Sequence, residues 1–198
     1  LIAWGAIGAR TTESQIHREL ASGLSMPVGF KNGTSGSNQI ALDAIGAARE
    51  SHHFLSVTKQ GVSAIVTTAG NKACHIILRG GRDGPNFDPT SIAKVESQLK
   101  KAGLAPHLMV DCSHGNSQKD YRKQPEVAAK LCDQIAEGCH SIAAVMIESN
   151  LIEGNQQLGE DLTSLVYGQS VTDACISWQS TEAVLEAFSQ AVRARRDR

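Results

Sequence analysis

The chain has 198 residues, of which 41% are hydrophobic and 20% charged, and this balance is typical of a folded globular protein. A formal net charge of −1 argues against nucleic acid or a membrane surface as a general partner. No apolar run approaches the roughly 20 residues of a membrane-spanning helix. No secretory signal is visible, and the five cysteines form no CxxC pair, so we expect reduced thiols in a cytoplasmic protein.

Short apolar segments alternate with amphipathic ones along the chain. The pattern predicts strands over residues 1–6, 27–30, 74–78, 108–110 and 142–147. It predicts helices over about 13–24, 38–49, 89–102, 124–137 and 180–195. A β-hairpin over about 54–68 interrupts this rhythm, and residues 153–172 are expected to form a long polar loop. Strand–helix alternation of this kind predicts an α/β fold with a parallel sheet.

Two architectures fit this alternation: an open doubly wound sheet and a closed eight-stranded barrel. No GxGxxG follows the first predicted strand, which weakens the dinucleotide-binding option. Charged groups at successive strand ends favour a (β/α)8 TIM barrel, whose loops face one mouth. Only about five core strands are predicted, and the chain starts at Leu1 without Met. We therefore expect residues 1–198 to be the C-terminal part of a single barrel domain, with only its later strands and helices.

Three cations follow predicted strands: Arg10, Lys31 and Arg79. Nearby glycines let backbone amides approach an anion, and arginine grips phosphate or carboxylate through two parallel bonds. The pattern predicts a small phosphorylated substrate that also carries a carboxylate. The alternative is that each cation pairs with a local acid such as Glu13 or Asp83.

A second set of strand-end residues consists of His114, Glu148 and Asp173. One imidazole and two carboxylates suit Mn²⁺, Fe²⁺ or Zn²⁺ better than Ca²⁺. These residues are far apart in sequence, and we expect that only the barrel would make them neighbours. Spacing alone leaves open that His114 is a hydrogen-bonded structural residue.

Several longer motifs occur in a fixed order. They are Trp4–Ser14, Pro27–Thr34, Ile77–Gly81, Asp111–Ser117, Val145–Ser149, Glu153–Gln156 and Ser170–Cys175. Over essentially all 198 residues the chain resembles the type I 3-deoxy-D-arabino-heptulosonate 7-phosphate (DAHP) synthases. The resemblance implies a metal-dependent, aldol-like condensation of phosphoenolpyruvate with D-erythrose 4-phosphate to DAHP and phosphate, the first step of the shikimate pathway.

The resemblance also assigns residues. Phosphoenolpyruvate would be bound by the Ala9 amide and by Arg10, Lys31 and Arg79. Lys31 would also donate a proton, and Asp173 could touch the sugar hydroxyls. His114, Glu148 and Asp173 match three of four ligands of a divalent metal (Mn²⁺, Fe²⁺, Co²⁺ or Zn²⁺), and Lys31 and His114 are the expected catalytic residues.

Two departures from the family pattern matter. The family's fourth ligand, a cysteine, and its Lys-Pro-Arg-Thr segment have no counterpart, so we expect this chain alone to be incomplete and inactive. Neither Cys112 nor Cys175 lies in the matching context. Asn150 stands where the family often has histidine.

In feedback-inhibited members of the family, the inserted hairpin and the preceding helix bind an aromatic amino acid. The matching positions are Leu20, Leu24, Ser25, Phe54, Ser56 and Val66. By the same resemblance we expect a homo-oligomer, a dimer or a tetramer. Two alternatives stay open: a catalytically inactive remnant that partners a complete synthase, and another phosphate-binding barrel, such as an aldolase, in which Lys31 forms a Schiff base.

Overall fold

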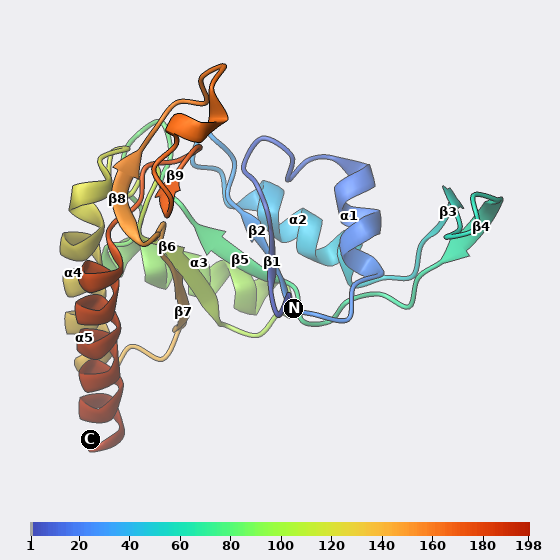
Figure 1. Ribbon diagram of the computed structural model, residues 1–198. Helices are drawn as coiled ribbons and strands as arrows, with labels where there is room; N and C mark the ends of the chain where they lie inside the picture. The colour runs from blue at the N-terminus through green and yellow to red at the C-terminus, as the bar shows by residue number, and fades with distance from the viewer. Residues whose placement is uncertain (1) are drawn as a thin grey trace.

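The computed structural model describes residues 2–198, and its centre is a parallel sheet (Figure 1). The strands of this sheet are β1 (Gly5–Ile7), β2 (Val28–Lys31), β5 (His75–Leu78), β6 (Leu108–Asp111) and β7 (Ile142–Met146). Within the described residues they lie in chain order, β1-β2-β5-β6-β7, and every neighbouring pair is parallel. A doubly wound sheet reverses its strand order, and this sheet does not. Leu1, where the first strand was predicted to start, lies outside the described residues.

Each predicted helix is present, with small shifts at its ends. The helices are α1 (Gln15–Ser22), α2 (Gln39–Ala48), α3 (Pro89–Lys101), α4 (Gln124–Ala136) and α5 (Trp178–Arg196), and two short 3₁₀ turns are η1 (Tyr121–Lys123) and η2 (Leu162–Ser164). α2 and α3 lie behind the sheet in the view of Figure 1, and α5 packs along α4. None of the helices within residues 2–198 has the length and apolarity to cross a bilayer. The prediction of an α/β fold with a parallel sheet is therefore confirmed.

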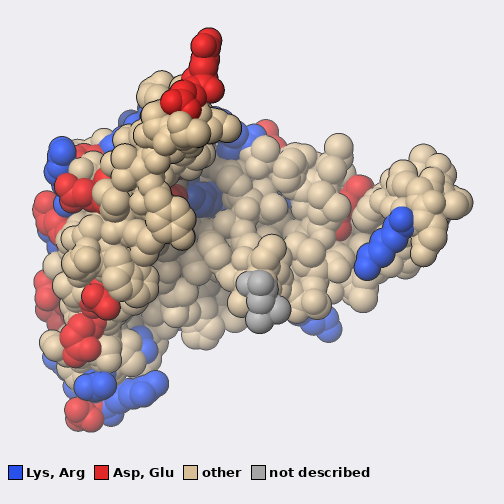
Figure 2. Space-filling model, in the orientation of Figure 1, with Lys and Arg blue, Asp and Glu red and all other residues tan. Residues whose placement is uncertain are grey.

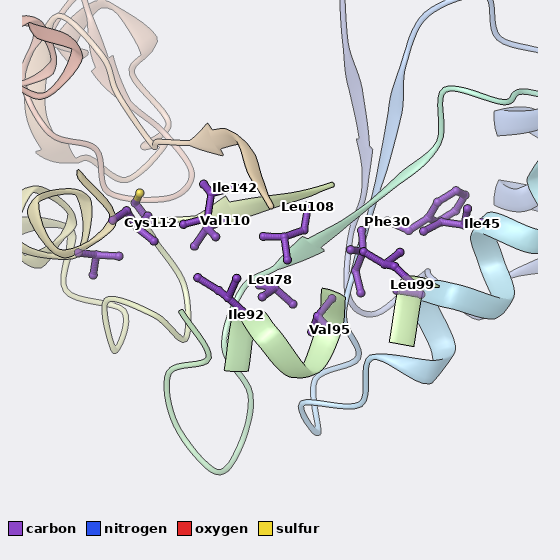
Figure 3. Packing of buried hydrophobic residues seen from close by; sticks show 14 of the residues in the cluster. Phe30, Ile45, Leu78, Ile92, Val95, Leu99, Leu108, Val110, Cys112 and Ile142 are labelled. Atoms are coloured by element: carbon purple, nitrogen blue, oxygen red, sulfur yellow. The ribbon is translucent and has the colours of Figure 1, made fainter. Parts of the chain in front are cut away.

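The core lies between the sheet and its helices. Phe30, Leu78 and Val110 project from β2, β5 and β6 and are fully buried. They belong to one cluster with Ile45 of α2 and Leu99 of α3 (Figure 3). Because the short strands are buried along their length, they read as continuous apolar runs. This packing fixes the strand ends that carry the site.

The inserted hairpin is also confirmed. β3 (His53–Val57) and β4 (Ser63–Thr67) pair antiparallel and project away from the body beside α1 (Figure 1). The base of the hairpin is tied to α1, because the hydroxyls of Ser22 and Thr68 lie 2.7 Å apart.

The segment predicted as one long polar loop contains strands. β8 (Ile152–Asn155) and β9 (Gln169–Ser170) form a small parallel sheet. Side-chain amides support it: Gln169 Nε2 donates to the Glu153 carbonyl at 2.9 Å, and Gln156 Nε2 to the Val166 carbonyl at 2.8 Å. Hydrophobic patterning missed these strands because polar side chains hold them.

Candidate active site

The site forms where the parallel strands end, at one edge of the sheet. Lys31 ends β2, Asp111 ends β6, and Arg79 directly follows β5. Glu148 follows β7 by two residues. Parallel strands bring their carboxyl ends to the same edge, so residues scattered over the sequence meet there.

All four predicted anion-binding residues line one cavity of about 360 Å³. Ala9, Arg10, Lys31 and Arg79 surround it, and His114 borders it. Figure 2 shows the hollow on this face of the molecule, with Lys or Arg side chains inside it. Among residues 2–198, no ion pair joins Arg10 or Arg79 to an acid, so the alternative of local pairing is not supported for these two.

A second, larger cavity of about 590 Å³ shares Arg10, Arg79 and His114 with the first. Its wall also includes Arg82 and Lys119, which sequence reasoning did not single out. Cationic side chains therefore line both cavities.

The three predicted metal ligands also come together. Ligand atoms of His114, Glu148 and Asp173 all lie within 4.8 Å of one another, and His114 Nε2 is 3.6 Å from Asp173 Oδ2. Burial raises the pKa of Glu148, with His114 opposing this shift and Asp173 adding to it. Two carboxylates that converge on one imidazole form a donor set that fits a divalent cation such as Mn²⁺, Fe²⁺, Co²⁺ or Zn²⁺.

Backbone pairing after β7 brings Asp173 to the other two ligands. Asp173 follows β9, which belongs to the small sheet rather than to the central one. Its loop is anchored beside β7 because Ser149 and Ile176 form a parallel bridge and the Ile176 N–H donates to the Glu148 carbonyl at 3.0 Å. Backbone pairing after β7 therefore places Asp173, which itself stays exposed.

Asp111 is a site residue to which the sequence assigned no role. Its side chain is fully buried, and its Oδ2 lies 2.9 Å from Lys31 Nζ and 2.8 Å from His114 Nδ1. The carboxylate therefore lies against the second ring nitrogen of His114, Nδ1, while Nε2 faces Asp173. Burial opposes ionisation of Asp111, but His114 and Lys31 outweigh it and lower its pKa. The available signal was its position, at the end of an apolar run just before Ser113 and His114.

The backbone around His114 is strained and tightly packed. His114 has φ of +53°, a left-handed conformation that residues other than glycine rarely adopt. The next residue, Gly115, donates its N–H to the Arg79 carbonyl at 2.9 Å. Gly80 has φ of +76°, and a Cβ there would lie 2.5 Å from the Gly115 carbonyl carbon. The loops that carry Arg79 and His114 therefore interlock through two glycines.

Asn32, directly after Lys31, also fixes the Arg79 loop. Its side chain is fully buried. Its Oδ1 accepts from the Arg79 N–H at 2.8 Å, and its Nδ2 donates to the Gly80 carbonyl at 2.9 Å. A buried, fully bonded amide of this kind holds the backbone of neighbouring strand ends in one arrangement.

The predicted effector residues lie apart from this site, on α1 and the hairpin. Phe54, Ser56 and Val66 share the half-buried face of the hairpin. Leu20 and Leu24 of the α1 region are 54% and 41% exposed, and Ser25 is exposed as well.

Comparison with known proteins identifies the family. Residues 1–186 match the family described as the DAHP synthetase I family. The Phe-sensitive phospho-2-dehydro-3-deoxyheptonate aldolase of Escherichia coli K12 is 59% identical over 196 residues, covering 99% of this chain and 55% of the relative. The phenylalanine-inhibited enzyme of Saccharomyces cerevisiae is 58% identical, with 97% of this chain and 54% of the relative covered.

A solved structure agrees with these sequences. The phospho-2-dehydro-3-deoxyheptonate aldolase of Francisella tularensis superposes with a TM-score of 0.92 at 53% identity, over 98% of this chain and 56% of that one. The chain thus spans about half the length of the relatives it matches. Its sequence and its fold agree, and the chain belongs to the DAHP synthetase I family.

Proposed function

We propose that this chain is the later part of a DAHP synthase, which condenses phosphoenolpyruvate with D-erythrose 4-phosphate. One observation carries the proposal: a cavity with three cations borders a set of three metal-ligand side chains, and His114 belongs to both. That arrangement suits an anionic enol substrate placed beside an aldehyde held by a metal.

In this proposal the anion cavity holds phosphoenolpyruvate. Arg10 and Arg79 would grip its phosphate and carboxylate, because guanidinium matches such groups with paired hydrogen bonds. The Ala9 amide and the Lys31 ammonium would complete the contacts. Lys31 would also donate a proton, whose acceptor is the aldehyde oxygen that becomes a hydroxyl when the enolpyruvate carbon bonds to the aldehyde carbon.

A Schiff-base role for Lys31 is disfavoured. Its Nζ lies 2.9 Å from the fully buried carboxylate of Asp111, and this ion pair would have to be broken before the amine could attack a carbonyl carbon. A Schiff base needs the neutral amine as nucleophile. Lys31 is therefore better placed as a cation and proton donor than as a nucleophile.

His114, Glu148 and Asp173 would hold the divalent metal. When bound, the metal supplies Lewis-acid polarisation of the sugar-phosphate aldehyde. Asp173, which is exposed and lines the larger cavity, would also contact the sugar hydroxyls.

We further propose that residues 1–198 are the C-terminal part of a single (β/α)8 barrel domain. Strands in chain order with a parallel register are what consecutive strands of such a barrel show. The Francisella structure is matched over only 56% of its length, so the remaining strands would come from the part without a counterpart here. The complete protein would be a homo-oligomer, a dimer or a tetramer.

An aromatic amino acid is the proposed effector. Of the relatives from Escherichia coli K12, one is named Phe-sensitive and another Tyr-sensitive. The effector would lie between the half-buried hairpin face and α1, against Phe54 and Leu20. Phe54→Ala should abolish inhibition by Phe or Tyr, whereas Leu55→Ala, on the opposite, exposed face of β3, should leave it unchanged. Equal inhibition of both variants would contradict this placement.

The proposed function is tested by following phosphoenolpyruvate consumption with erythrose 4-phosphate and Mn²⁺, with and without a chelator. The complete protein that contains these residues is compared with the 198 residues alone. We expect chelator-sensitive turnover in the complete protein only, and its loss in the Arg79→Met and His114→Ala variants. A folded complete protein without turnover would instead favour the alternative of a catalytically inactive remnant that partners a complete synthase.

A further inference from the structure

One oxygen atom links Lys31 in the anion cavity to His114, which borders that cavity and belongs to the metal-ligand set. Oδ2 of Asp111 lies 2.9 Å from Lys31 Nζ and 2.8 Å from His114 Nδ1. Lys31 belongs to the anion cavity, and His114 belongs to the metal-ligand set. A single carboxylate oxygen therefore contacts a substrate-facing cation and a ligand-bearing imidazole.

Hydrogen bonds from Ser113 and Asn116 fix the orientation of the Asp111 carboxylate. Its Oδ1 accepts from the Ser113 N–H at 2.8 Å. The Asp111 carbonyl accepts from Asn116 Nδ2 at 2.8 Å, and Asn116 is itself buried. Because its Oδ1 and its backbone carbonyl are both hydrogen-bonded, Asp111 cannot move with Lys31 without changing its distance to His114.

Burying a carboxylate costs free energy that an apolar residue would avoid. Stability alone therefore does not explain Asp111 at the end of β6. Its negative charge is shared between Lys31 and His114. An anion that binds Lys31 partly neutralises the ammonium charge, so the ammonium offsets less of the negative charge of Asp111. More of that negative charge then acts on the imidazole of His114. An imidazole backed by a carboxylate is a better metal ligand.

We infer that Asp111 is a positioning residue that couples the two halves of the site, so that phosphoenolpyruvate bound at Lys31 tightens metal binding at His114 and the metal tightens phosphoenolpyruvate binding by the same factor. This inference rests on the proposed function for the identity of the anion. Its geometric basis, one oxygen between Lys31 and His114, is independent of turnover.

The experiment titrates the complete protein with Co²⁺, read by visible absorption, in the presence and absence of phosphoenolpyruvate. We expect phosphoenolpyruvate to tighten Co²⁺ binding in the parent. Asp111→Asn keeps the shape but removes the charge, and we expect it to weaken Co²⁺ binding about 10- to 100-fold and to reduce the effect of phosphoenolpyruvate. Glu126→Gln, which removes an exposed carboxylate paired with Lys130 on α4, is the matched control and should change neither quantity. Unchanged Co²⁺ affinity in a folded Asp111→Asn variant would overturn the inference.

A second pair of variants tests the coupling independently if Asp111→Asn does not fold. Arg10 and Lys31 both line the anion cavity, but only Lys31 contacts Asp111. Both Arg10→Met and Lys31→Met should weaken phosphoenolpyruvate binding. At saturating phosphoenolpyruvate, Arg10→Met should retain the tightening of Co²⁺, and Lys31→Met should lose it. Equal tightening in the two variants would refute coupling through Asp111.

The outcomes separate this inference from the proposed function. If the complete protein shows no turnover but its Lys31→Met variant loses the coupling, the role of Asp111 as the link is supported. The proposed reaction would then fail on its own. Normal turnover in the parent with unaltered Co²⁺ binding in Asp111→Asn would defeat only the inference.

Discussion

Both polar atoms of the Gln124 side chain bind the backbone of Glu148. Gln124 Oε1 accepts from the Glu148 N–H at 2.9 Å, and Gln124 Nε2 donates to the Glu148 carbonyl at 3.1 Å. Gln124 is fully buried at the first residue of α4. A helix that packs outside the sheet therefore sets the position of a proposed metal ligand.

Replacing Gln124 by methionine should disturb both stability and metal binding. The change leaves the Glu148 N–H without its partner, and an unsatisfied buried group costs about 1–3 kcal/mol. We expect a free energy of unfolding lower by that amount, measured by urea denaturation, and a weaker Co²⁺ affinity. Gln190→Met, at an exposed position of α5, is the control and should be near neutral. A variant that binds Co²⁺ like the parent would show that Glu148 is held by other contacts.

Two glycine substitutions should have opposite effects. Gly80→Ala places a Cβ 2.5 Å from the Gly115 carbonyl carbon at a φ of +76°, so the Arg79 and His114 loops must separate. We expect lower stability and a higher KM for phosphoenolpyruvate. Gly46→Ala lies in α2 with no atom within 4 Å of the new Cβ, and should raise stability by about 0.5–1 kcal/mol. Thermal unfolding of both variants measures the contrast, and a neutral Gly80→Ala would contradict the interlocked loops.

Asp88 should make α3 sensitive to acid. Its side chain caps the helix by accepting from the Ser91 N–H at 3.0 Å, and hydrogen bonds from Ser91 lower its pKa. A lowered pKa means that the folded protein favours the carboxylate, so this stabilisation exists above the unfolded pKa and is lost as the pH falls through the folded one.

The Asp88→Ala variant tests this stabilisation. It should cost about 0.5–2 kcal/mol at pH 7, and the difference from the parent should shrink below about pH 4. Urea unfolding at pH 7 and pH 3 measures it. Glu182→Ala on the exposed face of α5 should show no such pH dependence. A constant difference at both pH values would mean that the charge of Asp88 does not contribute.

Cysteine labelling should report the burial of two thiols. Burial raises the pKa of the Cys74 thiol to about 11, with Arg49 opposing the shift, and burial also raises the pKa of Cys112 well above its usual range. Because the thiolate is the reactive form, alkylation of Cys74 at pH 8 should be about two orders of magnitude slower in the folded protein than in urea. Mass spectrometry of each cysteine peptide measures the rates, and equal rates would contradict burial of Cys74.

The sequence alone determined the elements that depend on local patterning. Apolar runs such as Leu108–Val110 predict strands because their side chains are buried on both faces, and the spacing of Ile92, Val95 and Leu99 predicts α3 because its apolar side chains share one face. The residue types of the site were also readable, since Arg79 directly follows one such run and His114 lies four residues after Val110.

Only the tertiary structure decided how those residues act on one another. Asp111 was visible as a polar residue at a strand end, but the bridge from Lys31 to His114 depends on contacts between β2 and the loop after β6. Gln124 had no sequence signal, because its partner is a backbone 24 residues away. β8 and β9 are held by side-chain amides rather than by apolar alternation. Hydrophobic patterning records which side chains are buried, whereas hydrogen bonds between distant segments are set only when the chain has packed.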